Sequence, residues 1–236
     1  MASNENQVGF NVMRVRLTLL TPALGTCPGD EDIYRSWVAS KAPEGTAGIE
    51  DQVAAIGVGE VIEKGKTVFP KLEDGTPILW AYQMKGFFKE ACGFLRQVKG
   101  TESSMLTSYK QKIDGLVFPR GFEDVEDAIK IDTHGQPLGE LQRSLRSGFP
   151  ERTSLACSET VPAGSTIDMD IAYLELEKTK KSTADLGDAI REWLSYGAHK
   201  GLLQWRNGGK GKFTCDVIDP DTGELERIEP FGGMAL

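Results

Sequence analysis

Hydrophobic and polar residues alternate near the start of the chain, and this alternation predicts a strand over residues 12–20. Successive side chains of a strand point to opposite faces of its sheet. The apolar residues at 15, 17 and 19 would therefore be buried, and the opposite face would carry Arg14, Arg16 and Thr18. The same period of two gives residues 167–177 one apolar face, and a last strand is predicted over residues 212–218.

Two other stretches have the helical spacing of apolar residues, and we expect helices over residues 80–98 and 183–199. Thr183 is the expected N-cap of the second helix. A short helix carrying Ile33 and Trp37 is predicted over residues 30–40. The expected buried residues of the two long helices are Trp80, Met84, Phe87 or Phe88, Ala91, Leu95 and Val98 in the first, and Leu186, Ile190, Trp193, Leu194 and Gly197 in the second.

The remaining segments have weaker patterns. Residues 67–69 and 77–79 flank the turn residues 73–75 and predict a hairpin. Residues 99–157 contain short strand-like pieces at 115–119 and 128–131 and an acidic cluster at 123–127, and we interpret this range as an insertion.

This order of elements predicts an α+β fold of the ferredoxin-like (RRM-like) type, a β-α-β sheet with two helices on one face and large insertions. The other face would be open and would carry Arg14, Arg16 and Thr18. We expect one domain over residues 1–236. Its core would comprise residues 12–25, 67–98 and 158–218, its insertions 26–66 and 99–157, and its acidic C-terminal tail 219–236.

Composition excludes several classes of protein. The chain has 236 residues, of which 39% are hydrophobic, and this excludes disorder, collagen-like repeats and coiled coil. The apolar runs are shorter than a membrane helix, and the first eleven residues lack the pattern of a secretory signal. We therefore expect a cytoplasmic protein that does not contact membranes.

The sequence predicts no cofactor and no metal site. The four cysteines include no Cys-x-x-Cys pair, and the two histidines, His134 and His199, are far apart in the chain. Neither a P-loop nor a Gly-x-Ser-x-Gly motif is present. We expect the cysteines to be buried or inert thiols.

The net charge of −8 argues against a general nucleic-acid binder, because phosphate repels a negative surface. The acids are concentrated, however, in the cluster at 123–127 and in residues 216–230. These two segments hold more net negative charge than the whole chain, so the remainder is close to neutral and can bind RNA locally.

One segment combines glycines with cations and no acid, residues 196–214. Glycines let backbone N–H groups approach phosphates, and an aromatic ring can stack on a base. The alternative is a glycine-rich turn with solvated lysines and Trp205 in the core. The candidate RNA-binding residues of this segment are Lys200, Trp205, Arg206, Lys210 and Lys212. Arg14 and Arg16 of the open sheet face are further candidates.

Three segments resemble the RAMP superfamily, the ferredoxin-like backbone and processing subunits of CRISPR effector complexes. They are the opening MRVRLTLLTPALGT, then Pro77-Ile78 with the Met84–Lys89 run MKGFFK, and then the run ETVPAGS at 159–165, which is similar to the backbone subunits. The resemblance covers about half of the chain. The sequence departs from the family at residues 80–83, WAYQ in place of Pro-Gly-Ser-Ser, and in its looser glycine-rich loop. A stand-alone relative encoded by a phage or other mobile element would account for both departures.

Two further groups of cations are candidate RNA contacts. Lys85 and Lys89 lie four residues apart on one helix face and could grip neighbouring phosphates, the alternative being ordinary solubility. Insertions in this family often contact RNA or the next subunit, so Arg143, Arg146 and Arg152 could form a flexible arm rather than a solvated loop.

The resemblance also implies an aspartate in the loop after the first strand of those subunits that cleave RNA, and Asp30 and Asp32 occupy that loop. Acidic residues there are equally expected at a helix start, as His199 is at a helix end. We therefore name no catalytic residue.

Three hypotheses follow. The first is an RNA-binding RAMP-like subunit that binds single-stranded RNA and self-assembles or joins a ribonucleoprotein. The second is an endoribonuclease of the same fold. The third is a protein-interaction module or an inhibitor that docks on an effector complex.

Overall fold

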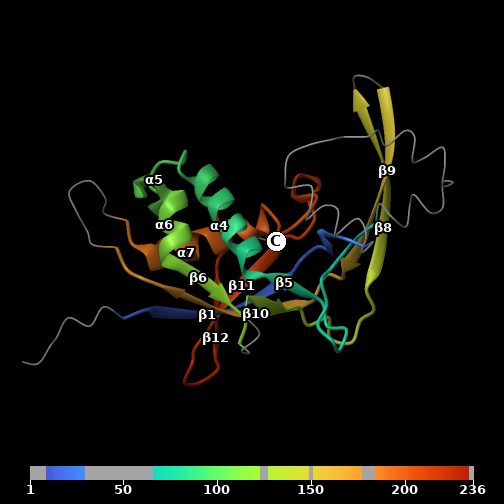
Figure 1. The fold of residues 1–236 in the computed structure, drawn as a ribbon. Coiled ribbons are helices and arrows are strands. Elements are labelled where there is room, and N and C mark those ends of the chain that lie inside the picture. The colour runs from blue at the N-terminus through green and yellow to red at the C-terminus, as the bar shows by residue number, and fades with distance from the viewer. Residues whose placement is uncertain (1–8, 30–65, 123–126, 149–150, 177–183, 234–236) are drawn as a thin grey trace, which may run out of the picture.

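A five-stranded sheet forms the centre of the molecule (Figure 1). The computed structural model describes residues 9–29, 66–122, 127–148, 151–176 and 184–233, without the side chains of residues 144–155. The strands lie in the order β12-β11-β1-β10-β6, and every neighbouring pair is antiparallel. Their bounds are β1 Asn11–Leu19, β6 Val117–Arg120, β10 Thr166–Tyr173, β11 Phe213–Ile218 and β12 Leu225–Ile228.

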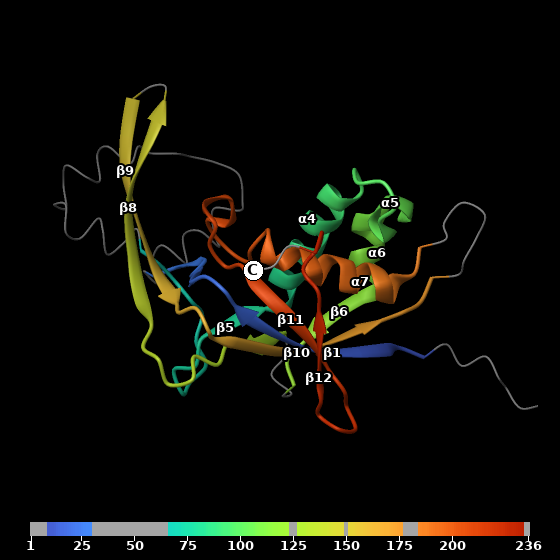
Figure 2. The same cartoon turned by 180° about the vertical axis from the view of Figure 1, so that it is seen from behind.

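Two helices, α4 (Ala81–Leu95) and α7 (Leu186–Ser195), cover one face of this sheet (Figures 1 and 2). Their apolar stripes pack against the buried alternate residues of β1, β10 and β11. Aromatic rings join the layers. The ring centroids of Phe87 in α4 and Phe213 in β11 are 5.2 Å apart, and those of Phe88 in α4 and Trp193 in α7 are 5.6 Å apart. The core is thus built by the predicted pattern of apolar positions.

Chain order and strand order together define the connections. Along the chain, the elements of this layer pair run β1, α4, β6, β10, α7, β11, and in the sheet β1 lies between β11 and β10. The predicted α+β class is therefore confirmed, with mostly antiparallel sheets.

A second sheet stands beside the first and includes a long hairpin. Its strands β2 (Ala23–Leu24), β9 (Glu151–Val161), β4 (Thr67–Val68) and β3 (Cys27–Pro28) lie in that order, and β8 (Gly139–Gly148) pairs with β9 along its full length. Hairpin β8–β9 extends away from the rest of the described chain in both views (Figures 1 and 2). A two-stranded sheet of β5 (Ile78–Trp80) and β7 (Ala128–Lys130) completes the strands.

The range 99–157 supplies helices and strands, including one strand of the main sheet. It contains the short helices α5 (Glu102–Met105) and α6 (Tyr109–Leu116), and it supplies β6, an edge strand of the main sheet. Strand β6 pairs with β10, and its residues alternate between buried and more exposed positions. Val117 and Pro119 lie on the buried side.

The predicted hairpin of residues 67–69 with 77–79 is wrong. Residues 67–68 pair with β3 and β9, while β5 pairs with β7. A shorter hairpin does form about the predicted turn, with a bridge between Lys71 and Pro77 and backbone hydrogen bonds from Ile78 to Pro70 at 2.9 Å and from Leu72 to Thr76 at 3.0 Å.

Boundaries differ at three further places. Helix α7 begins after Asp185, whose carboxylate accepts from the backbone N–H of Asp188, while the predicted N-cap Thr183 lies outside the described residues. Helix α4 ends at Leu95, so Val98 is exposed. Part of the predicted acidic tail forms β12. The predicted helix at 30–40 lies outside the described residues.

Candidate functional site

The face of the main sheet opposite the helices carries a ladder of alternating charges. In one row, Arg14 of β1 lies opposite Asp170 of β10 and binds it through Nε at 2.9 Å, and Arg120 of β6 lies 3.9 Å from the same carboxylate. We call this row and the next one the arginine–aspartate ladder.

The second row crosses four strands. Arg16 of β1 lies between Asp168 of β10 and Asp216 of β11, and it binds Asp168 through two hydrogen bonds of 2.7 and 2.6 Å. Arg227 of β12 contacts Asp216 at 2.8 Å. Within each row the charge thus alternates in sign from strand to strand, whereas along β1 and β10 the neighbouring members of the ladder have the same sign.

These ion pairs reduce the net charge that Arg14 and Arg16 present to a ligand. Their hydrogen bonds to Asp170 and Asp168 raise the pKa of Arg14 and Arg16 above the ordinary value. The arginines keep about two fifths of their side-chain surface exposed, at 41% and 39%, so they can still meet a ligand. Their charge, however, is largely balanced by aspartates within the sheet.

Aromatic side chains lie along one end of the open face. Phe10, which precedes β1, meets Phe118 of β6 edge to face at 5.6 Å between ring centroids. The guanidinium of Arg14 lies 4.5 Å from the ring centroid of Phe122. Phe10 is 56% exposed and Phe122 46%, so both rings offer free surface, and the ring of Phe122 lies beside the cation of Arg14.

The glycine-rich loop holds its cations less freely than the sequence suggests. Lys200 lies 3.0 Å from Glu90 of α4, and Arg206 also pairs with Glu90. Trp205 is half-buried rather than in the core and has a positive φ of 57°. In the described residues, the side chains of Lys210 and Lys212 make no hydrogen bond or ion pair.

Close packing explains the glycines at two positions of this loop. A Cβ on Gly201 would lie 2.0 Å from the carbonyl oxygen of Lys210, and one on Gly211 would lie 2.3 Å from that of Leu202. The loop therefore folds back on itself, and the backbone N–H of Leu202 donates to Gly211 at 2.8 Å.

The lysine pair of α4 points to a neighbouring helix. Lys85 donates to the backbone carbonyl of Asp114 at 3.0 Å, and Lys89 forms an ion pair with the Asp114 carboxylate at 2.5 Å. Both lysines thus contact the same residue of α6, as their four-residue spacing allows. The predicted phosphate grip would have to break these contacts.

The predicted flexible arm is an ordered hairpin. Arg143, Arg146 and Arg152 lie in β8 and β9, where the register sets them opposite Ala156, Thr153 and Ser147. The side chain of Arg143 is exposed, and those of Arg146 and Arg152 lie outside the described residues.

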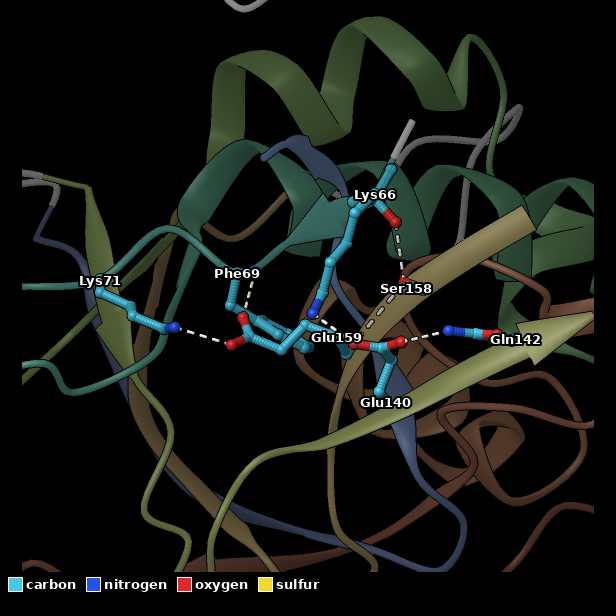
Figure 3. Close-up of polar contacts among 8 residues, drawn as sticks. Lys66, Phe69, Lys71, Glu140, Gln142, Ser158 and Glu159 are labelled. Carbon is cyan, nitrogen blue, oxygen red and sulfur yellow. Dashed lines mark hydrogen bonds and ion pairs between the residues drawn. The ribbon is translucent and has the colours of Figure 1, made fainter. Parts of the chain in front are cut away.

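Polar contacts anchor the base of this hairpin (Figure 3). Lys66 pairs with Glu140, which also accepts from Gln142 at 2.6 Å. Glu159 accepts from Lys71 at 2.7 Å and from the backbone N–H of Phe69 at 3.0 Å. The hydrogen bond from Lys66 is the main reason that the pKa of Glu140 is lowered to about 2.

Of the residues considered for catalysis, the structure describes only His199. His199 contacts the backbone carbonyl of Phe231 through Nε2 at 2.7 Å. Asp30 and Asp32 lie outside the described residues. In the part of the chain that the structure describes, no three His, Cys, Asp or Glu side chains are grouped as a metal site, and no helix has the length and apolar character to span a membrane.

Sequence reasoning missed the partners of the predicted cations. Asp168 and Asp170 alternate with apolar residues in the run IDMDI, and this pattern marks them as residues of the open face, but only the register shows that they lie beside Arg16 and Arg14. Glu90 follows Lys89 directly, and nothing in the sequence links it to Arg206.

Among known proteins, similar chains are found in solved structures. No protein-family model matches the sequence, and no curated protein matches it. A chain of the Type III-B Cmr-beta complex, solved by cryo-EM bound to cognate target RNA, is similar with a TM-score of 0.46 and 12% sequence identity. The match covers 94% of this chain and 62% of that chain, so this chain spans less than two thirds of the length of that structure.

Proposed function

We propose that this chain is an RNA-binding subunit of the RAMP type, which binds single-stranded RNA on the open face of its main sheet and assembles with copies of itself or with other proteins. The observation that carries the proposal is an open face with exposed aromatic rings beside arginines. Single-stranded RNA is bound by such platforms, because bases stack on rings while cations hold the backbone.

The order of strands and helices supports the ferredoxin-like part of the proposal. Two passes of strand, helix, strand, with the strands in the order β11-β1-β10-β6, are the arrangement of that fold. The three sequence segments similar to RAMP proteins fall on β1, on β5 with α4, and on the end of β9 leading to β10. We retain a single RAMP-like domain as part of the proposal.

The proposed surface has a defined extent. It begins at Phe10 and Phe118, continues over Arg14, Arg120 and Phe122, and crosses the arginine–aspartate ladder. Lys210 and Lys212 of the glycine-rich loop offer a second cationic patch. The hairpin β8–β9 carries three arginines and supplies a surface for RNA or for a neighbouring subunit.

Removal of one exposed ring tests the proposal. Phe10→Ala should weaken binding of fluorescently labelled single-stranded RNA about tenfold, because stacking of one base contributes ~1–3 kcal/mol. Fluorescence anisotropy at low salt measures the change. Phe94→Ala on α4 is the matched control, since Phe94 is a phenylalanine of similar exposure, at 47% against 56%, with Lys200 5.2 Å from its ring centroid.

Two results would contradict the proposal: absence of RNA binding by the unmodified protein, or equal losses in Phe10→Ala and Phe94→Ala. The ultraviolet absorbance ratio of the purified protein gives an early indication, because co-purified nucleic acid raises absorbance at the shorter wavelength.

One observation favours an alternative, the protein-interaction module. Arg14, Arg16 and Arg227 form ion pairs with aspartates, so the open face has fewer free cations than a general RNA-binding surface. A protein that purifies without nucleic acid and with a stable protein partner would support this alternative.

A further inference from the structure

A pocket of about 260 Å³ opens where the ladder meets the small sheet β5–β7. Its apolar wall is formed by Leu72, Phe122 and Ala128. The volume lies slightly below the ~300–1,000 Å³ of sites for drug-sized ligands. It therefore suits one flat ring system with part of its sugar, not a longer stretch of chain.

Polar groups converge on the other side of the pocket. Asp132 holds His134 by two contacts, with Oδ1 accepting from the backbone N–H at 2.7 Å and Oδ2 3.2 Å from Nδ1. Nε2 of the same histidine lies 3.3 Å from the hydroxyl of Thr166. Main-chain hydrogen bonds of 2.9 Å in both directions tie Asp132 to Thr166, so the group is fixed to strand β10.

The turn that carries His134 is also fixed. His134 and Gly135 have positive φ angles of 52° and 74°, and the backbone N–H of Gln136 donates to Thr133 across the turn at 3.0 Å. Two consecutive positive φ angles are typical of a tight type I′ turn. The histidine is thus held at the pocket before any ligand arrives, and this reduces the entropy cost of binding.

Two groups of the pocket, the Asp132 carboxylate and the Arg16 guanidinium, can form hydrogen bonds beyond those that they already make. A carboxylate accepts up to about four hydrogen bonds, so Asp132 can accept two adjacent donors besides its contacts to His134. Arg16 uses Nε and Nη2 for Asp168, which leaves the N–H groups of Nη1 for an acceptor. The pocket therefore offers a carboxylate and a guanidinium beside an aromatic ring, and its charged lining also includes Lys130 and the Asp168 that pairs with Arg16.

This pattern matches the edge of one nucleobase better than the others. Guanine presents two neighbouring donors, N1–H and the N2 amino group, and the acceptors O6 and N7. Uracil presents a single N–H between two carbonyls, and adenine one amino group beside a ring acceptor. Unstacked bases of single-stranded RNA are recognised through such edges, with a ring stacked on the base.

We propose that this pocket binds one unstacked guanine of single-stranded RNA, with Asp132 accepting from N1–H and N2, Arg16 donating to O6 and Phe122 stacking on the ring. The inference rests on the proposed function for the identity of the polymer. The pocket itself can be tested with the mononucleotide.

The first experiment follows backbone amide signals of the full chain by NMR during titration with guanosine monophosphate, and in parallel with uridine monophosphate. Guanosine monophosphate should shift the signals of Gly121 and His134, and the uridine nucleotide should bind about tenfold more weakly. Asp132→Asn should abolish the difference, and Phe122→Ala should weaken the binding of both nucleotides, because stacking on the ring does not depend on the identity of the base. Asp219→Asn is the matched control, because Asp219 also accepts from a backbone N–H two residues on, at 2.8 Å, but lies outside this pocket.

The second experiment compares a short oligouridine with the same oligonucleotide carrying one central guanosine. The guanosine should raise affinity about tenfold in the unmodified protein and in Asp219→Asn, and the ratio should fall to about one in Asp132→Asn.

The two experiments separate the two failures. Equal shifts with both mononucleotides, no shift at Gly121 and His134, or an unchanged preference in Asp132→Asn would overturn the guanine pocket, whatever the affinity for RNA. A guanosine-specific shift without binding of either oligonucleotide would support the pocket and contradict the proposed RNA-binding function.

Discussion

Arg14 and Arg16 are paired with aspartates because of the register between β1 and β10. Residues opposite each other in an antiparallel pair share a face, so Arg14 meets Asp170 and Arg16 meets Asp168. A slip of one residue would turn both arginines toward the buried side. Exposed ion pairs contribute only about 0–1 kcal/mol each, so we attribute to the ladder a role in fixing the register more than in overall stability.

For single residues, the sequence pattern predicts the face on which a side chain lies but not its partner. Alternation placed Arg14, Arg16 and Thr18 on the open face correctly, because it depends only on the period of a strand. It could not reveal that Glu90 pairs with Lys200 and Arg206, because these contacts join residues more than one hundred positions apart. Whether any of these residues binds RNA stays a prediction.

Acidification should affect the base of hairpin β8–β9 through Glu140. Its folded-state pKa is lowered from 4.5 to about 2, chiefly by the hydrogen bond from Lys66, so the carboxylate stays ionised where the unfolded chain would be protonated. Its contribution to stability is therefore complete above pH 4.5 and is lost as pH falls toward 2. In Glu140→Gln, the thermal midpoint should be lower than that of the unmodified protein above pH 4.5, and the difference should shrink toward pH 2.

Thermal unfolding followed by circular dichroism across that pH range measures this difference. Glu224→Gln is the control, since in the described residues the Glu224 carboxylate has no hydrogen bond or ion pair. A pH-independent difference for Glu140→Gln would contradict the proposed cause.

At the scale of elements, the long periodic segments were predictable, and among the short ones the strand-like pieces at 115–119 and 128–131 correspond to β6 and β7. Strands β1, β10 and β11 and helices α4 and α7 carry repeated apolar positions, because each buries one face against the core. Strand β6 has only four residues, including a proline, and two of the four residues of β12 are charged, so the sequence pattern did not show the place of either strand in the sheet. Hairpin β8–β9 has few apolar residues at alternate positions, so its pairing left little trace in the pattern.

One contact between elements should dominate the attachment of α5. Glu192 of α7 accepts from the backbone N–H groups of Glu102 and Ser103 at 2.7 and 3.1 Å, and Trp193 donates to the Ser103 hydroxyl at 2.9 Å. Glu192→Ala leaves the two N–H groups without an acceptor at a helix N-terminus, so the free energy of unfolding should fall by about 1–3 kcal/mol.

Denaturant unfolding measures the loss. The control is Glu226→Ala. The Glu226 carboxylate is 76% exposed and lies as far as 3.9 Å from the Arg191 guanidinium, so its removal should lower the free energy of unfolding by less than about 1 kcal/mol. Equal losses in the two variants would show that the capping contact is not important for stability.

For the whole molecule, the distribution of charge matters more than the net value of −8. On the ladder, four arginines face three aspartates, so this surface is close to neutral although the chain is acidic. Under the proposed function, the aspartates set how strongly the arginines can attract phosphate. Binding of RNA should accordingly be weak and moderately sensitive to salt.

Asp170→Asn should strengthen RNA binding and weaken the fold. Asp170 is nearly buried, with 10% of its side chain exposed, and it contacts Arg14 and lies near Arg120. Its neutralisation frees these cations for phosphates, so the slope of log affinity against log salt should steepen by about 0.7 for each further phosphate that the arginines neutralise. Anisotropy titrations over a range of salt concentrations measure the slope.

The control for net charge is Asp219→Asn, which changes the total by the same amount at an exposed turn residue that is not a member of the ladder. An equal change of slope in both variants would indicate a general charge effect and would contradict a role for the ladder in RNA binding.

The two borders of the main sheet limit how copies of this chain can join. Pro119 in β6 has no backbone N–H, and the other border, β12, carries Glu226 and Arg227 on a short exposed strand. Proline and charge at sheet borders disfavour the addition of a further strand. The sheet is thus protected against growth from one molecule into the next, which limits edge-to-edge aggregation. Ordered assembly would have to use side-chain surfaces or hairpin β8–β9.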